Sequence, residues 1–148
     1  MDIESLINRE ELTIANRQKR ISAMLIDDLL LSILLVIILF DKITNIQTIE
    51  EIIFLTNQFV LEFMFIKIMY QTFFVYKYGA TIGKMFVKIR VVSLRGANGH
   101  TVSMAFNRAV FRIISEILFY LGFLWGIFDK YSQTWHDKTA KTIVINAD

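Results

Sequence analysis

The hydrophobic positions of this chain form two long runs. The first extends from Ile21 to Phe40 and is interrupted by only two charged residues, and the second extends from Phe59 to Tyr78. About 20 apolar residues, at a rise of ~1.5 Å each, make a helix roughly 30 Å long, which matches the hydrocarbon core of a bilayer. Both runs therefore predict membrane-spanning helices, over about 21–40 and 59–78.

A third hydrophobic segment, residues 104–128, has two unlike halves. The first half carries Arg108, Arg112 and Glu116 at intervals of four residues, which places them on one face of a helix. The second half is apolar but too short to cross a membrane alone. One interpretation is a single straight span. We favour an interfacial helix followed by a re-entrant segment, with two glycines in the second half allowing the bend.

The remaining segments have the patterns of strands and of an amphipathic helix. Residues 86–103 predict a small β-hairpin, because 87–94 are rich in β-branched side chains and 95–99 (Arg-Gly-Ala-Asn-Gly) supply turn residues. Residues 142–145 (Thr-Ile-Val-Ile) predict a C-terminal strand. Residues 1–20 mix apolar and charged side chains and predict an amphipathic helix.

The positive charges indicate which ends face the cytoplasm. Four Lys and Arg precede the first run, one lies in residues 41–58, and five lie between Lys77 and Arg95. Positively charged loops remain on the cytoplasmic side of a membrane. We therefore expect the N-terminus and residues 79–103 in the cytoplasm and residues 41–58 outside, in a multi-pass protein. The lysines near the C-terminus place that end in the cytoplasm as well.

Composition narrows the class of protein further. Of the 148 residues, 55% are hydrophobic and none is Cys, which excludes disulfides, thiolate metal sites and Cys nucleophiles. A net charge of +2 is too small to indicate nucleic acid as a partner. The N-terminal segment lacks the apolar core of a signal peptide, so we expect no cleavage. We divide the chain into a cytoplasmic helix, 1–20, and a membrane domain, 21–148.

Asp27 and Asp28 stand inside the first hydrophobic run. A charged carboxylate at the centre of a membrane helix costs on the order of 3 kcal/mol, so such residues are paired, protonated or functional. Asp27 could exchange a proton for a cation, as carboxylates do in transporters, or form a structural ion pair between helices. Asp28 points about 100° away around the helix. We expect it to have a structural role, through a hydrogen bond to Ser32 or through contact with the interface.

Several cations are candidate partners of Asp27. Our first choice is Lys67 on the second predicted span, followed by Arg108 or Arg112 of the third segment. Arg20 lies on the same helix face as Asp27 but roughly 10 Å away along the axis, which disfavours a direct bond. The spacing of the charges alone does not choose between these partners.

Basic residues at the predicted inner leaflet have two interpretations. Lys84, Arg108 and Arg112 could contact anionic lipid headgroups, which attract each basic side chain by about 1 kcal/mol. Alternatively, Arg108 or Arg112 could neutralise Asp27 or Asp137. The first interpretation makes a lipid bilayer with anionic headgroups a partner of this chain.

No motif in the sequence indicates an enzyme. Residues 79–85 (Gly-Ala-Thr-Ile-Gly-Lys-Met) only superficially resemble a phosphate-binding loop, because three residues separate the glycines and Met follows the Lys. His136 and Asp137 form the one His-Asp neighbour pair, without the further ligands of a metal site and without a nucleophile elbow. We interpret them as a turn that orders the C-terminal tail, with a proton relay as the alternative. We expect no cofactor, no metal and no catalytic constellation.

The order and spacing of several short motifs resemble the RDD family of small bacterial membrane proteins, named for one arginine and two aspartates. The resemblance covers the chain from about residue 17 to the C-terminus. It rests on Arg20, Asp27, residues 81–84 (Thr-Ile-Gly-Lys), the strand 89–92, Arg108, Arg112, residues 122–125 (Gly-Phe-Leu-Trp), Asp129, residues 133–138 (Gln-Thr-Trp-His-Asp-Lys) and 142–144. The second signature aspartate is Asp137 or Asp129. This chain has Ile82 where family members often have proline.

The resemblance implies a multi-pass protein of the bacterial inner membrane, and some family members have been linked to sodium–proton exchange. We therefore expect an all-α membrane protein with two transmembrane helices, an interfacial or re-entrant third element, a small cytoplasmic β-hairpin and a C-terminal strand. Its function is either cation–proton exchange, as a homo-oligomer or with a larger membrane partner, or that of a non-enzymatic scaffold or accessory subunit. The candidate charge network is Asp27, Arg20, Asp28, Lys67 and Asp137, with Lys84, Arg108, Arg112, Asp129 and His136 as charge partners or headgroup contacts.

Overall fold

The structure is a computed structural model that describes residues 2–95, 100–118 and 120–147. Its eight described helices are α1 (Ile3–Glu10), α2 (Arg17–Ile38), α3 (Phe40–Thr44), α4 (Ile49–Tyr78), α5 (Ile82–Phe86), α6 (Val102–Ile117), α7 (Leu121–Phe128) and α8 (Trp135–Ala140). Its two described strands are β1 (Ile89–Ser93) and β2 (Thr142–Asn146).

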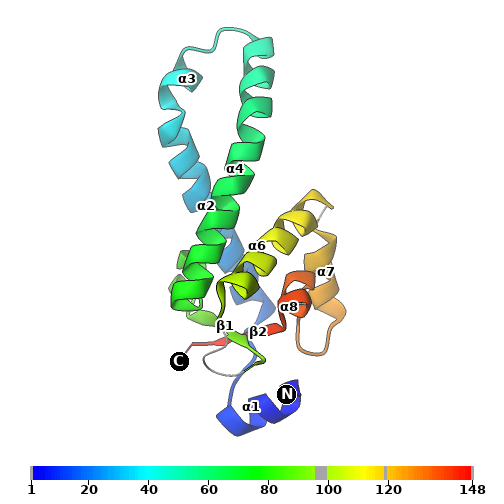
Figure 1. Cartoon of the computed structure of the whole chain (residues 1–148). Coiled ribbons are helices and arrows are strands. Elements are labelled where there is room, and N and C mark those ends of the chain that lie inside the picture. The colour runs from blue at the N-terminus through cyan, green and yellow to red at the C-terminus, as the bar shows by residue number, and fades with distance from the viewer. Residues whose placement is uncertain (1, 96–99, 119, 148) are drawn as a thin grey trace.

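Helices α2 and α4 are long and apolar enough to cross a membrane. They extend well beyond the rest of the molecule and are joined at their far ends by the segment that contains α3 (Figure 1). Only 17% and 6% of their most apolar windows are buried within the protein, so most of their surface is left for lipid or another protein. The two expected spans are present as helices.

The start of α4 differs from the prediction. We expected a connection over residues 41–58, but α4 begins at Ile49 because Thr48 caps it. The Thr48 side chain accepts a hydrogen bond from the backbone N–H of Glu51 at 3.3 Å. Glu50 and Glu51, which made this segment look like a loop, also complement the positive end of the helix dipole.

The small sheet is not a local hairpin, and this part of the prediction was wrong. Strand β1 pairs antiparallel with the C-terminal strand β2, with Val91 opposite Val144. The physical reason is that Thr101 caps α6 directly after this segment, which leaves no length for a returning strand. Residues 96–99, the centre of the expected turn, lie outside the described residues.

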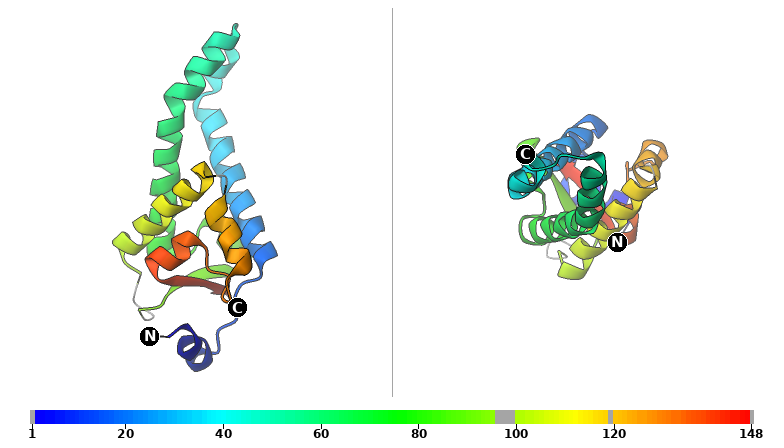
Figure 2. Two further views of the ribbon diagram at one scale, coloured as in Figure 1. Left: turned by 90° about the vertical axis from the view of Figure 1, so that its right-hand side faces the viewer. Right: turned by 90° about the horizontal axis from the view of Figure 1, so that it is seen from above.

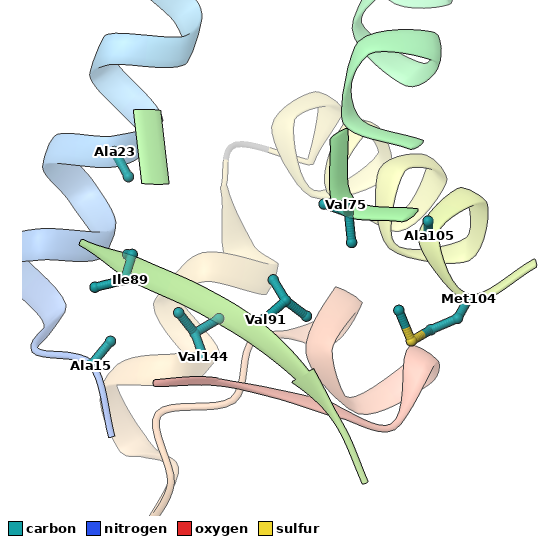
Figure 3. Packing of buried hydrophobic residues seen from close by; sticks show 8 residues of the cluster. All are labelled: Ala15, Ala23, Val75, Ile89, Val91, Met104, Ala105 and Val144. Atoms are coloured by element: carbon teal, nitrogen blue, oxygen red, sulfur yellow. The ribbon is translucent and has the colours of Figure 1, made fainter. Parts of the chain in front are cut away.

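Each face of the two-stranded sheet is covered by a different apolar layer. Val91 and Val144 pack with Val75 and Ala105 toward the α2, α4 and α6 side (Figure 3). Val92, Ile143 and Ile145 face the other way and pack against α1. Helix α1 therefore covers this face of the sheet (Figure 2, left).

The N-terminal helix is shorter than the predicted 1–20. It ends at Glu10, and a new helix begins at Arg17. Between them Ile14 forms an isolated bridge with Ile145, and the backbone N–H of Ala15 donates to the Val144 carbonyl at 3.0 Å. The apolar side chains of α1 pack against the sheet, where Leu6 is only 1% exposed.

The third hydrophobic segment is not a straight span. Helices α6 and α7 are bent by 103° relative to each other at a short break. The expected role of the glycines is corrected, because the break precedes both of them. A Cβ at Gly122 would overlap the Ser115 hydroxyl, and one at Gly126 would lie 3.1 Å from Thr134 Cγ2. The glycines thus allow α7 to pack closely on its neighbours.

The elements that follow the long helices gather at one end of the molecule. Helices α6, α7 and α8 and the sheet surround the lower part of α2, and both termini lie at this end (Figures 1 and 2). Helix α5 packs against α2, and α6 packs against both α4 and α8. Most of the buried polar residues lie at this end of the molecule.

Candidate functional site

Asp27 is 1% exposed, and its described hydrogen-bond donors are all uncharged. The hydroxyl of Tyr70 donates to its Oδ1 at 2.7 Å, and the hydroxyl of Thr81 donates to its Oδ2 at 2.6 Å. The backbone N–H of Gly83 donates to Oδ1 at 2.8 Å. Among the described residues no Lys or Arg lies within ion-pair distance of Asp27. This buried carboxylate is satisfied by hydrogen bonds from α4, Thr81 and α5.

A turn after α4 brings these donors to Asp27. Gly79 ends α4 with φ +71°, a left-handed conformation that glycine adopts without strain. Helix α5 then returns onto α2, and Gly83 lies so close that a Cβ would overlap the Ala23 carbonyl oxygen and lie 2.8 Å from Asp27 Oδ1. The glycine is therefore required for the backbone N–H to reach the carboxylate.

Asp137 is fully buried and is bound by two guanidinium groups. Arg20 of α2 pairs with its Oδ2, and Arg108 of α6 pairs with its Oδ1. The backbone N–H of Thr134 donates to Oδ2 at 3.1 Å, which completes a capping box at the start of α8. Burial alone would raise the pKa of Asp137, but Arg108 and Arg20 outweigh it and hold that pKa well below its usual range.

A third cluster joins the two long helices to α6. Lys67 of α4 lies 2.6 Å from Glu116 and 3.3 Å from Asp28. Arg112 of α6 lies 3.4 Å from Glu116 and 3.6 Å from Asp28. The expected pairing of Lys67 with Asp27 was wrong, because Asp27 faces α5 while the neighbouring Asp28, rotated by about 100°, faces Lys67. No hydrogen bond between Asp28 and Ser32 is found in the described part of the chain.

Asp129 and His136 complete the predicted set. Asp129 pairs with Lys138 at 2.7 Å and accepts hydrogen bonds from the backbone N–H groups of Tyr131 and Gln133. Burial opposes ionisation of Asp129, but Lys138 and these N–H groups outweigh it and lower its pKa. His136 is buried beside the Phe123 ring, and burial lowers its pKa well below the usual range although Asp137 opposes this.

A cavity of about 410 Å³ connects several of these groups. Charged groups that line it are Asp27, Arg17, Arg20, Arg108, Arg112 and Lys84. No hydrogen bond or ion pair joins Lys84 to another described residue. Burial, reinforced by Arg108 and Arg112, lowers the pKa of Lys84 to about 7. The cavity thus borders an anion that is already satisfied and a lysine whose charge changes near neutral pH.

The comparison with known sequences decides the family. The RDD family, a family of small bacterial membrane proteins, matches residues 14–141 of this chain. The chain belongs to the RDD family. Its membrane character follows from the family together with the apolar helices α2 and α4. The resemblance noted from the sequence is confirmed.

An individual relative extends this comparison. An uncharacterized protein of Rickettsia prowazekii (strain Madrid E) is 32% identical over 96 residues, which cover 65% of this RDD chain. The chain spans about half the length of this curated relative, since the match covers 50% of it. No solved structure gives a significant match.

Sequence reasoning named most of the clustered charges but missed the groups that hold Asp27. Tyr70 carried no signal beyond its place in the second apolar run. Thr81 and Gly83 belong to the motif that supports the family resemblance, but their residue types indicate only a turn. Glu116 was noticed on the polar face of residues 104–128 without a partner. No group of three or more His, Asp or Glu that could hold a metal occurs among the described residues.

Proposed function

We propose that this RDD protein is a non-enzymatic scaffold that crosses the bacterial inner membrane twice, with both termini and the sheet in the cytoplasm. The positions of the termini at one end of the molecule support this orientation (Figure 1). The excess of Lys and Arg in the segments at that end also supports it, because such segments remain in the cytoplasm.

One observation carries the scaffold proposal: the buried carboxylates at this end are occupied by donors of the protein itself. Asp137 ties α2 and α6 to α8 through Arg20 and Arg108. Asp27 ties α2 to α4 and α5 through neutral donors. Contacts of this kind fix the packing of segments that are far apart in the sequence. They give a reason for polar groups at these depths that requires no transported ion.

The orientation is tested by thiol labelling, for which a chain without Cys is well suited. We would introduce Asn8→Cys in α1 and Asn45→Cys after α3, two exposed positions at opposite ends of the molecule. In intact inverted membrane vesicles, a membrane-impermeant maleimide should label Asn8→Cys and should label Asn45→Cys only after detergent is added. Equal labelling of the two variants in intact vesicles would contradict the orientation.

Cation–proton exchange is the second candidate function. Asp27 borders a cavity that also contains Lys84, whose pKa of about 7 suits proton uptake and release near neutral pH. Two features oppose a sodium site: the oxygens of Asp27 are occupied, and basic residues outnumber carboxylates in the cavity lining. Two spanning helices also do not enclose a water path, so exchange would require a homo-oligomer or a larger membrane partner.

Flux in proteoliposomes separates the two candidates. The scaffold proposal expects no proton flux driven by sodium or potassium gradients from the wild-type protein, at any protein-to-lipid ratio that allows oligomers. Exchange expects flux that is lost in a folded Asp27→Asn variant. Asp41→Asn, an exposed carboxylate beyond the end of α2, is the matched control. Cation-driven flux that Asp27→Asn abolishes and Asp41→Asn preserves would overturn the scaffold proposal.

A further inference from the structure

The cavity at the sheet end has a size that suits a ligand. Its volume of about 410 Å³ lies within the range of small-molecule sites, roughly 300–1,000 Å³. Residues of α2, α5, α6 and α7 and of the segment 132–136 line it. The scaffold function proposed above gives this space no role, and the cavity remains to be explained.

The cavity lining includes positively charged donors whose hydrogen-bonding capacity is not filled by the described residues. Lys84 has no hydrogen bond or ion pair to another described residue. Arg112 is 6% exposed and pairs with Glu116, and its Nη2 lies 3.6 Å from Asp28 Oδ1 without a hydrogen bond to any described residue. Asp27, by contrast, has both oxygens occupied by Tyr70, Thr81 and Gly83. Among the described lining residues, the Lys84 ammonium and the Arg112 Nη2 can therefore still donate to an anion, whereas the Asp27 carboxylate is not open to a cation.

Other residues of the cavity lining are apolar and are also exposed on the outer surface of the protein. Ile21 of α2 and Leu124 and Ile127 of α7 line the cavity. They are also 55%, 48% and 46% exposed. In a membrane protein such exposed apolar side chains lie against lipid chains. The cavity lining thus combines buried cationic side chains with apolar side chains that also face the lipid.

From this arrangement we infer that the cavity binds one anionic phospholipid, with its phosphate against Lys84 and Arg112 and an acyl chain along Ile21, Leu124 and Ile127. A phosphate supplies several acceptor oxygens, which match guanidinium and ammonium donors. Arg20 and Arg108, although bound to Asp137, also line the cavity and add to the positive potential there. The ligand is a resident lipid held in a built site, in contrast to the lipids that surround any membrane helix.

The binding experiment uses the whole purified protein in a zwitterionic detergent. Native mass spectrometry measures the lipid-bound fraction with phosphatidic acid, with phosphatidylcholine of the same chains and with inorganic phosphate as competitor. We expect one phosphatidic acid per chain, bound about tenfold more tightly than phosphatidylcholine, a difference of about 1.4 kcal/mol. Equal binding of the two lipids would overturn the inference. Displacement of the lipid by millimolar inorganic phosphate would also overturn it, since the site would then recognise a free anion.

Two pairs of variants locate the bound lipid. Lys84→Met removes an unpartnered cation and should weaken phosphatidic acid binding about fivefold, whereas Lys77→Met, an exposed lysine at the end of α4, should not. Leu124→Trp should fill the cavity, whereas Leu121→Trp, on the same helix at 49% exposure but outside the lining, should leave it open. Equal effects within both pairs would place the lipid on the general surface and overturn the inference.

Discussion

Asp27 and Asp137 are two buried aspartates of one chain that the protein accommodates in opposite ways. Asp137 is neutralised by Arg20 and Arg108, so charge balances charge. Within the described part of the chain, Asp27 receives hydrogen bonds from two hydroxyls and one backbone N–H and has no charged partner. Both are at most 1% exposed, so burial does not distinguish them.

The difference decides what each site tolerates. Removing the charge of Asp137 leaves two guanidiniums at a buried site without their counter-ion, which is strongly unfavourable. Removing the charge of Asp27 leaves neutral donors that lose hydrogen-bond strength but carry no charge of their own. The Asp137 site is therefore the one that depends on its charge, and replacement of Asp27 by a neutral residue of the same shape should cost less.

The largest effect should come from neutralising Asp137. We expect Asp137→Asn to lower the free energy of unfolding by about 3–5 kcal/mol, because Arg20 and Arg108 become uncompensated. Asp27→Asn should cost only about 1–3 kcal/mol. Unfolding of both variants by denaturant titration in mixed micelles, followed by circular dichroism, measures the difference. A loss for Asp27→Asn as large as that for Asp137→Asn would remove the distinction between the sites.

Much of this arrangement could be predicted from the sequence, for physical reasons. The apolar runs determine α2 and the core of α4, and Asp27 stands out because a charge inside such a run requires a partner. Arg20 and Asp137, with Asp129 as the alternative to Asp137, are indicated by the resemblance to the RDD family. Which charge meets which partner could not be predicted. The partners depend on how α2 is rotated about its axis. Because adjacent residues of a helix point in different directions, Asp27 contacts α5 and Asp28 contacts Lys67.

The sheet shows a second limit of sequence reasoning. A strand pattern identifies residues that favour extended backbone, but it does not name the partner strand. Ile89–Ser93 pairs with residues near the C-terminus, at long separation along the chain. That pairing depends on α6, α7 and α8 folding back over the sheet (Figure 2), which the local pattern does not contain.

A smaller effect tests the neutral donors of Asp27 one at a time. Tyr70→Phe removes the hydroxyl that donates to Asp27 Oδ1 while keeping the ring, and should cost about 0.5–1.5 kcal/mol of unfolding free energy. Tyr78→Phe, on the same helix and 54% exposed, is the control and should change stability little. If Tyr70→Phe and Tyr78→Phe unfold alike in the same micelles, the hydroxyl contributes nothing to holding Asp27.

The last prediction concerns the pH dependence of stability through Lys84, whose pKa is lowered in the folded protein. Burial dominates, and with Arg108 and Arg112 it lowers this pKa to about 7, against the opposing pull of Asp137 and Asp27. Between pH of about 7 and about 10.5 the unfolded chain therefore holds a proton on Lys84 that the folded chain has released, and stability rises with pH across that window. Below pH of about 7 Lys84 is protonated in both the folded and the unfolded chain, so it no longer makes the free energy of unfolding depend on pH.

Replacing Lys84 with methionine isolates that slope. We expect the thermal midpoint of the wild-type protein in a zwitterionic detergent to rise between pH 7 and pH 9.5 relative to that of Lys84→Met, because only the wild type releases the proton on folding. Lys77→Met, which changes an exposed lysine, should follow the wild type. Parallel curves for wild type and Lys84→Met would mean that Lys84 stays charged in the folded state. In that case the surroundings of the two aspartates would be more polar than their burial implies, and the contrast between the sites would weaken.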